Sequence, residues 1–239
     1  NLANDYSDAI RGADTADRLG PVRVTSAGLV APRRVLVATW IAFAIAVAVG
    51  IYLTAVTGPL ILAVGIASIA AGVLYTGGPR PYGYAGMGEL FVFLFFGLVA
   101  VNGSYYVQLE QLEWLPLVLS IPIGFLATAI LVVNNVRDID TDRRAGKRTL
   151  AVRIGRERAR RLYAALVLGS FVILPAGLWA ADGPGWALLA LPSLPLAASP
   201  LQAVAGHTDG PSLNRALAGT GMLLAAFSVL LATGLLIAA

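Results

Sequence analysis

The sequence predicts an all-α membrane protein, a polytopic bundle of transmembrane helices. Hydrophobic residues make up 58% of the 239 residues and charged residues only 13%, whereas about a quarter of an ordinary soluble domain is charged. Seven apolar stretches approach the roughly 20 residues that cross a bilayer core of about 30 Å as a helix. The chain has no cysteine and one histidine, His207, so thiolate and multi-histidine metal sites are excluded.

The predicted spans follow one another in order through mostly short connections. They cover residues 35–56, 60–75, 88–107, 114–136, 162–180, 184–204 and 213–239. Glycine and proline mark several breaks, as at Gly58-Pro59 and Gly183-Pro184, because both residues interrupt helices. Two longer connections, residues 11–34 and 137–161, are rich in arginine.

The basic residues test this count, because successive loops alternate between two sides if every span crosses once. All 17 Lys and Arg residues then fall on one side, in residues 1–34, 76–87, 137–161 and 205–215. Basic loops stay in the cytoplasm, so we predict seven complete spans in the cell membrane with this side cytoplasmic. The net charge of +4 therefore indicates topology, and we expect no nucleic-acid partner.

Two acidic segments lie on the basic side, at the edge of the bilayer. Residues 1–14 read NLANDYSDAIRGAD, and residues 134–142 read NNVRDIDTD. Because positions four apart share a helix face, each segment predicts a stripe of carboxylate and amide oxygens. The stripes are Asn4 and Asp8, with Asp5 adjoining, and Asn134, Asp138 and Asp142.

Carboxylates gathered at an apolar boundary repel one another and lose hydration, so a bound cation must compensate them. Oxygen ligands without His or Cys favour Mg²⁺, which completes its coordination with water and substrate phosphates. One such cluster is usually a solvated helix cap. Two clusters of the same pattern on one side favour a magnesium–diphosphate site.

Basic residues near the second segment are candidates for binding phosphate oxygens. Lys147 and Arg148 lie within two helical turns of Asp142, and Arg137 adjoins Asp138. The later arginines are predicted to set topology and contact lipid headgroups. The loop at residues 75–89, YTGGPRPYGYAGMGE, is too glycine-rich to be helical and forms either a re-entrant turn or a substrate lid. The spans carry no deep ionisable residue, which argues against a pump.

The acidic segments, and above all NNVRDIDTDRRAGKRTLAVRIG at residues 134–155, resemble the UbiA superfamily of intramembrane prenyltransferases. NLANDYSDAIRGAD, the YTGGPRPYGYAGMGE loop and LNRALAGTG are most similar to the branch that prenylates 1,4-dihydroxy-2-naphthoate in menaquinone synthesis. The resemblance covers the whole chain and implies a nine-helix bundle around a central cavity open to lipid. Residues 1–239 would then be one UbiA-like domain lacking its first helix and most of its second.

The resemblance also implies the site residues. Gly12 stands where the general pattern has a further aspartate, and Asp14, two residues on, is the alternative ligand. The implied Mg²⁺ ligands are Asn4, Asp8, Asp138 and Asp142; the catalytic residues are Asp5, Asp138 and Lys147; and the substrate-binding residues are Tyr75, Arg80, Arg137, Lys147 and Arg148.

The implied reaction transfers a polyprenyl group from polyprenyl diphosphate to 1,4-dihydroxy-2-naphthoate, with decarboxylation, giving demethylmenaquinone. Mg²⁺ and basic groups would stabilise the departing pyrophosphate. One alternative is a sister prenyltransferase acting on 4-hydroxybenzoate, homogentisate, haem or a lipid headgroup. Another is a non-enzymatic polytopic transporter, from which Mg²⁺-dependent binding of a polyprenyl diphosphate analogue would distinguish the enzyme.

Overall fold

The computed structural model describes residues 1–12, 19–20 and 22–238, so Asp14 lies outside the described residues. Every regular element in this part of the chain is helical, as the composition predicts. The elements are α1 (Leu2–Ile10), α2 (Pro32–Thr57), α3 (Pro59–Thr76), η1 (Tyr82–Ala85), α4 (Gly88–Val92), η2 (Phe93–Val99), α5 (Ala100–Leu109), α6 (Trp114–Arg144), α7 (Leu150–Ile154), α8 (Arg156–Ala180), η3 (Gly185–Ala197), α9 (Ala198–Gly206) and α10 (Gly210–Ala238).

The seven predicted spans are confirmed within the described chain. Each of seven helical stretches is long and apolar enough to cross a membrane; α4, η2 and α5 together form one of them, and η3 and α9 another. Two helices continue beyond their apolar stretch into charged residues. The fourth span reaches Arg144 and the fifth begins at Arg156, so α6 and α8 extend past the predicted bounds of 114–136 and 162–180.

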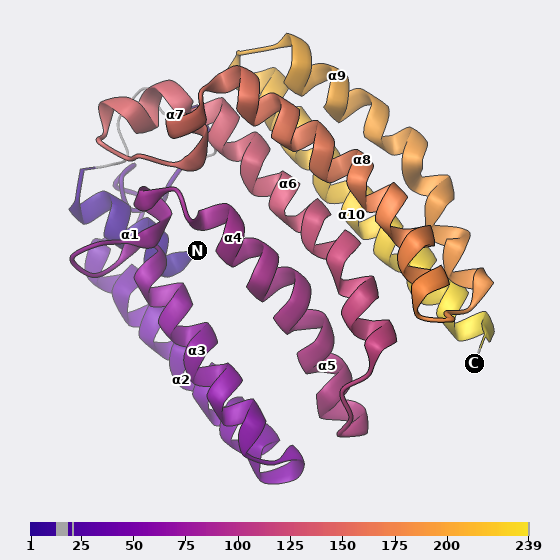
Figure 1. Ribbon diagram of the computed structural model, residues 1–239. Helices are drawn as coiled ribbons and strands as arrows, with labels where there is room; N and C mark the ends of the chain where they lie inside the picture. Colours follow the sequence, from indigo (N-terminus) through magenta and orange to yellow (C-terminus); the bar gives the residue numbers. More distant parts are fainter. Residues whose placement is uncertain (13–18, 21, 239) are drawn as a thin grey trace.

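The spans form two unequal groups (Figure 1). The helices α6, α8, α9 and α10 lie side by side, α2 and α3 form a separate pair, and α4 and α5 run between them. The core lies along α6, where Leu126, Ala129, Val133 and Val136 are fully buried. By contrast, most side chains of α2 and α3 are exposed, including Trp40 at 64%. In a bilayer, lipid covers such apolar faces.

The backbone departs from the α-helix inside two spans. Segment η2 is a π-helix, and at its Gly97 the chain crosses Gly124 of α6 so closely that a Cβ on Gly97 would lie 2.5 Å from the Cα of Gly124. Small residues permit this approach of two helices within a membrane. Segment η3 is a 3₁₀ helix containing Pro192 and Pro195, each of which lacks the N–H that an α-helix interior requires.

Both acidic segments are helical, as their spacing predicts. The first forms α1, and the second is the uninterrupted end of α6. The expectation that the loop at residues 75–89 is not helical is wrong at both ends, because α3 runs to Thr76 and α4 begins at Gly88. It is also wrong for the 3₁₀ turn Tyr82–Ala85 between them. In Figure 1, α1 and α7 gather at the end of the bundle where this loop also lies.

Candidate active site

Asp8 is the meeting point of three separate parts of the chain. Its side chain projects from α1 and the residue is only 3% exposed. Lys147, in the loop after α6, places its Nζ 3.1 Å from Asp8 Oδ2. The Tyr84 hydroxyl, from η1, donates to Asp8 Oδ1 at 2.5 Å. The ammonium of Lys147 also lies 4.8 Å from the centre of the Tyr84 ring, a cation–π contact.

Backbone hydrogen bonds hold the loop that carries Lys147. The Lys147 N–H donates to the carbonyl of Asp142 at 2.8 Å, and the Arg148 N–H donates to the carbonyl of Tyr84 at 2.9 Å. The reversal needs the positive φ of 74° at Gly146, which glycine adopts without strain. Lys147 therefore joins the first acidic segment to the end of the second, and both lie at the same end of the bundle.

Asp138 faces an internal arginine. The guanidinium of Arg137 forms two parallel hydrogen bonds with it, Nε to Oδ1 at 2.7 Å and Nη2 to Oδ2 at 2.6 Å. Arg137 is only 2% exposed and also donates to Asn214 of α10 at 2.7 Å and to Asn134 at 2.8 Å. Each of its three nitrogens is thus engaged within the protein. In this geometry Arg137 is the counter-ion of Asp138 and holds its carboxylate in place.

Asn4 and Asp5 anchor α1 to its neighbours. Asn4 Oδ1 accepts a hydrogen bond from the Thr76 hydroxyl at 2.9 Å, at the end of α3. Asp5, 7% exposed, accepts from the backbone N–H of Thr25 at 3.2 Å. Both residues therefore contribute oxygen atoms to this end of the bundle while fixing the position of Asp8, one helical turn from Asn4.

The remaining predicted residues lie around this centre at different depths. Tyr75, half-buried at the end of α3, packs its ring against Gly83. The next residue, Tyr84, donates its hydroxyl to Asp8 and accepts the Arg148 N–H at its carbonyl, beyond the second acidic segment. Arg80 and Arg148 are exposed on the surrounding loops. Within the described chain, Arg80 forms no hydrogen bond or ion pair. The structure therefore places Tyr75 against the loop that contacts Asp8, and it places the two arginines at the surface.

Two participants were not singled out from the sequence. Tyr84 was only one of several polar residues in the glycine-rich loop, and its bond to Asp8 joins positions 76 residues apart. Glu89, the last residue of the glycine-rich segment at residues 75–89, is 7% exposed and accepts a hydrogen bond from Asn135 of α6 at 2.9 Å. The sequence signal that could have identified Glu89 is the presence of an acidic residue at the start of an apolar span.

The donor chemistry of this end of the bundle fits magnesium. Its ligand atoms are carboxylate and amide oxygens, the donors that Mg²⁺ prefers. Among the described residues, no three Asp, Glu, His or Cys side chains gather closely enough to hold a metal by themselves. Instead, Lys147 neutralises Asp8 and Arg137 neutralises Asp138. Mg²⁺ usually takes only one or two protein carboxylates and fills its coordination shell with water and phosphate. The carboxylate and amide oxygens of the two acidic segments therefore suit a magnesium ion that is bound together with a phosphate group.

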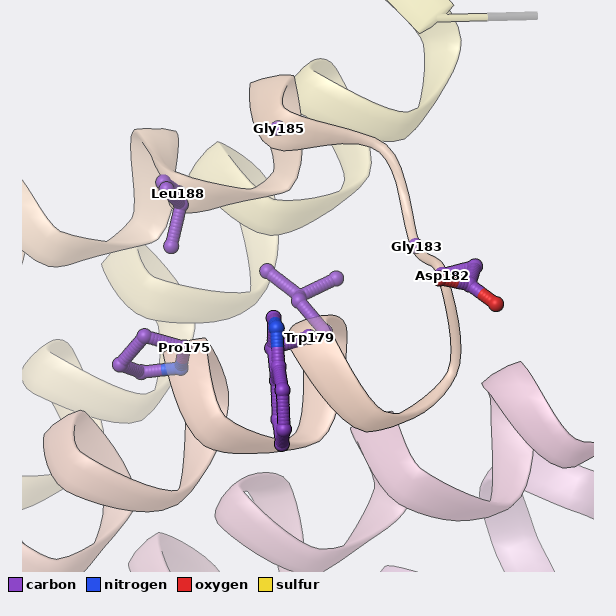
Figure 2. Close-up of a pocket in the computed structure, with 7 residues that line it drawn as sticks. Pro175, Trp179, Asp182, Gly183, Gly185 and Leu188 are labelled. Carbon is purple, nitrogen blue, oxygen red and sulfur yellow. The ribbon is translucent and has the colours of Figure 1, made fainter.

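One pocket lies away from this site (Figure 2). It has a volume of about 380 Å³ and lies where α8 turns into η3, at the opposite end of α8 from Arg156. Its lining residues are Pro175, Leu178, Trp179, Asp182, Gly183, Gly185 and Leu188. Asp182 is its one charged residue, and the carboxylate points away from the pocket in Figure 2. This pocket offers no group that would bind a diphosphate.

A helical bundle of seven spans, with buried carboxylates and their paired cations gathered at one end, defines a multi-pass membrane protein. A sequence profile of the UbiA prenyltransferase family matches residues 1–227. The chain belongs to this family and is an aromatic prenyltransferase, which confirms the resemblance identified in its acidic segments.

Curated relatives share sequence over nearly the whole chain. A 1,4-dihydroxy-2-naphthoate octaprenyltransferase of Mycobacterium tuberculosis is 44% identical over 239 residues, covering 98% of this chain and 79% of the relative. The protein of the same name from Mycobacterium leprae is 40% identical, covering 100% of this chain and 80% of the relative. The one from Bacillus subtilis is 32% identical, covering 99% and 76%.

Proposed function

We propose that this protein transfers a polyprenyl group from polyprenyl diphosphate to 1,4-dihydroxy-2-naphthoate, in the synthesis of menaquinone. The observation that carries the proposal is the Asp8–Lys147 pair, which joins the two acidic segments at one end of the bundle. The relatives that match nearly the whole chain, named as octaprenyltransferases for this acceptor, support the choice of substrate. Residues 1–239 act in this proposal as a single domain.

The donor diphosphate binds between the two acidic segments. Asn4, Asp8, Asp138 and Asp142 would hold Mg²⁺, which would supply positive charge to stabilise a departing pyrophosphate. Lys147 lies next to both segments, and its side chain can turn so that the ammonium pairs with a diphosphate oxygen in place of Asp8. Arg80 and Arg148, exposed on the adjoining loops, attract the anion as it approaches. Asp5 holds α1 in position through its bond to Thr25.

The chemistry is an electrophilic alkylation in which the protein binds and orients both substrates. The bond between C1 of the prenyl group and oxygen breaks, and its electron pair leaves with the diphosphate. A ring carbon of the acceptor then bonds to C1, and the ring carboxylate leaves as CO₂. The quinol that results is the reduced form of demethylmenaquinone. Exclusion of water protects the allylic cation, which water would otherwise quench.

The lipid bilayer is a further partner of the protein. The largely exposed apolar faces of α2 and α3 suit contact with lipid, where a polyprenyl chain would also be dissolved. We propose that the acidic segments face the cytoplasm, because all 17 basic residues lie in the connections on that side or in the helix ends that adjoin them.

A product assay with a panel of acceptors tests the proposal. The purified full-length protein in lipid nanodiscs is given octaprenyl diphosphate, Mg²⁺ and either 1,4-dihydroxy-2-naphthoate, 4-hydroxybenzoate or homogentisate. We expect mass spectrometry to detect prenylated, decarboxylated product from the naphthoate alone, with product formation abolished by EDTA and restored by added Mg²⁺. Preferential prenylation of another acceptor would assign the protein to a sister activity, and turnover in EDTA would contradict the role of magnesium.

A further inference from the structure

Glu89 carries a buried carboxylate oxygen without a hydrogen-bond partner. The residue lies in the first turn of α4 and is 7% exposed. Its Oε1 accepts a hydrogen bond from the Asn135 amide at 2.9 Å. Its Oε2 is buried and has no hydrogen-bond partner within the described chain. Because a buried polar atom left unsatisfied destabilises a protein, such an atom calls for a ligand that completes it.

The surroundings of Glu89 place it beside the candidate site. Its neighbour Gly88 packs so closely against Tyr75 that an added Cβ would lie 3.4 Å from the ring and 3.5 Å from the hydroxyl. The Tyr75 ring also packs against Gly83, next to Tyr84, whose hydroxyl donates to Asp8. Asn135, which bonds Glu89, precedes Asp138 by three residues on α6 and so lies about 4.5 Å from it along the helix axis, toward the apolar span.

A ligand that completes Oε2 is therefore a polar group, located next to the proposed diphosphate site on its apolar side. An isoprenoid chain has no such group, and a substrate carboxylate would be repelled by an ionised Glu89. A hydroxyl both donates and accepts hydrogen bonds, so it satisfies the carboxyl group whether ionised or protonated. We propose that Oε2 of Glu89 hydrogen-bonds a ring hydroxyl of the aromatic acceptor and so fixes the orientation of the ring. This inference rests on the proposed prenylation of a dihydroxynaphthoate.

The test compares acceptors within each variant. The kcat/KM for 1,4-dihydroxy-2-naphthoate is divided by that for 1-hydroxy-2-naphthoate and by that for 4-hydroxy-2-naphthoate, which each lack one ring hydroxyl. In the unsubstituted protein, the analogue that lacks the hydroxyl bound by Glu89 should have a kcat/KM about tenfold to a hundredfold below that of 1,4-dihydroxy-2-naphthoate. Because loss of a hydroxyl also makes the ring less nucleophilic, the two proteins are compared with each other: Glu89→Ala should lower that ratio about tenfold relative to the unsubstituted protein. A change in folded fraction alters both rates equally and leaves the ratio unchanged.

Two further variants, and the KM values for the diphosphate and Mg²⁺, distinguish acceptor binding by Glu89 from other roles of this residue. Glu89→Gln retains the bond to Asn135 and, because only Oε2 becomes an amide, should give an intermediate ratio even if Glu89→Ala does not fold. Asn102→Ala, on the same span, removes a bond to its own helix at Leu98 and should leave the ratio unchanged. An unchanged ratio in Glu89→Gln, or a larger rise in KM for the diphosphate or Mg²⁺ than for the acceptor, would overturn the inference. Absence of naphthoate prenylation by the unsubstituted protein would instead refute the proposed function.

Discussion

Asp138→Asn is expected to lower kcat about 10²–10³-fold, the loss typical of removing one preorganised charge contact to a transition state. Asp138 is 8% exposed, and its carboxylate is fixed in place by two hydrogen bonds from Arg137. An amide at this position keeps the shape of the side chain but removes the charge that would hold a magnesium ion against the diphosphate. The rate is measured with donor and acceptor both saturating.

Asp140→Asn is the matched control for this variant. It lies two residues further along the same acidic segment, but its side chain is 61% exposed and pairs at the surface with Arg156 and Arg143. We expect turnover within about twofold of normal, because exposed pairs contribute little. Asp138→Asn also leaves the buried Arg137 without its counter-charge and should lower stability by about 3 kcal/mol. Rates are therefore compared well below the unfolding temperature, and near-normal turnover in Asp138→Asn would refute its assigned role.

Breaking the Asp8–Lys147 pair is expected to destabilise the protein as well as inactivate it. The two side chains are 5% and 11% exposed, so either single variant, Asp8→Asn or Lys147→Met, leaves a buried polar group without its partner. Each should cost about 3–5 kcal/mol. The double variant should lose less than the two single losses combined, with a coupling of about 1–3 kcal/mol. Unfolding in mixed micelles measures all four proteins of the cycle.

A surface pair provides the control cycle. Arg161 and Glu157 lie one turn apart on α8 at 3.2 Å, with side chains 76% and 68% exposed. Glu157→Gln and Arg161→Met should couple by no more than about 0.5 kcal/mol. If the Asp8–Lys147 cycle showed a coupling as small as this one, the two acidic segments would not be joined as described.

The spans and the helical state of the acidic segments could be predicted from the sequence, because both depend on local properties. Hydropathy over about 20 residues determines each span, and four-residue spacing determines which oxygens share a helix face. Even so, the end of α6 lies at Arg144 rather than near Val136, since the helix continues once it leaves the apolar layer.

The contacts that build the site could not be predicted, because they join distant positions. Lys147 and Asp8 are 139 residues apart, and Arg137 meets Asn214 of α10 at a separation of 77. Position alone made Arg137 a candidate diphosphate ligand. Its bond to Asn214 depends on the packing of α6 against α10, which the sequence does not reveal. The π-helix of η2 likewise accompanies the close approach of Gly97 to Gly124, which is tertiary packing rather than a property of the local sequence.

Binding of a non-hydrolysable polyprenyl thiodiphosphate, titrated calorimetrically with and without Mg²⁺, tests most directly whether the two acidic segments together hold the donor. The account predicts binding that requires Mg²⁺, that weakens about a hundredfold or more in both Asp8→Asn and Asp138→Asn, and that is unchanged in Asp140→Asn. Equal affinity without Mg²⁺, or normal affinity in either Asp8→Asn or Asp138→Asn, would contradict it.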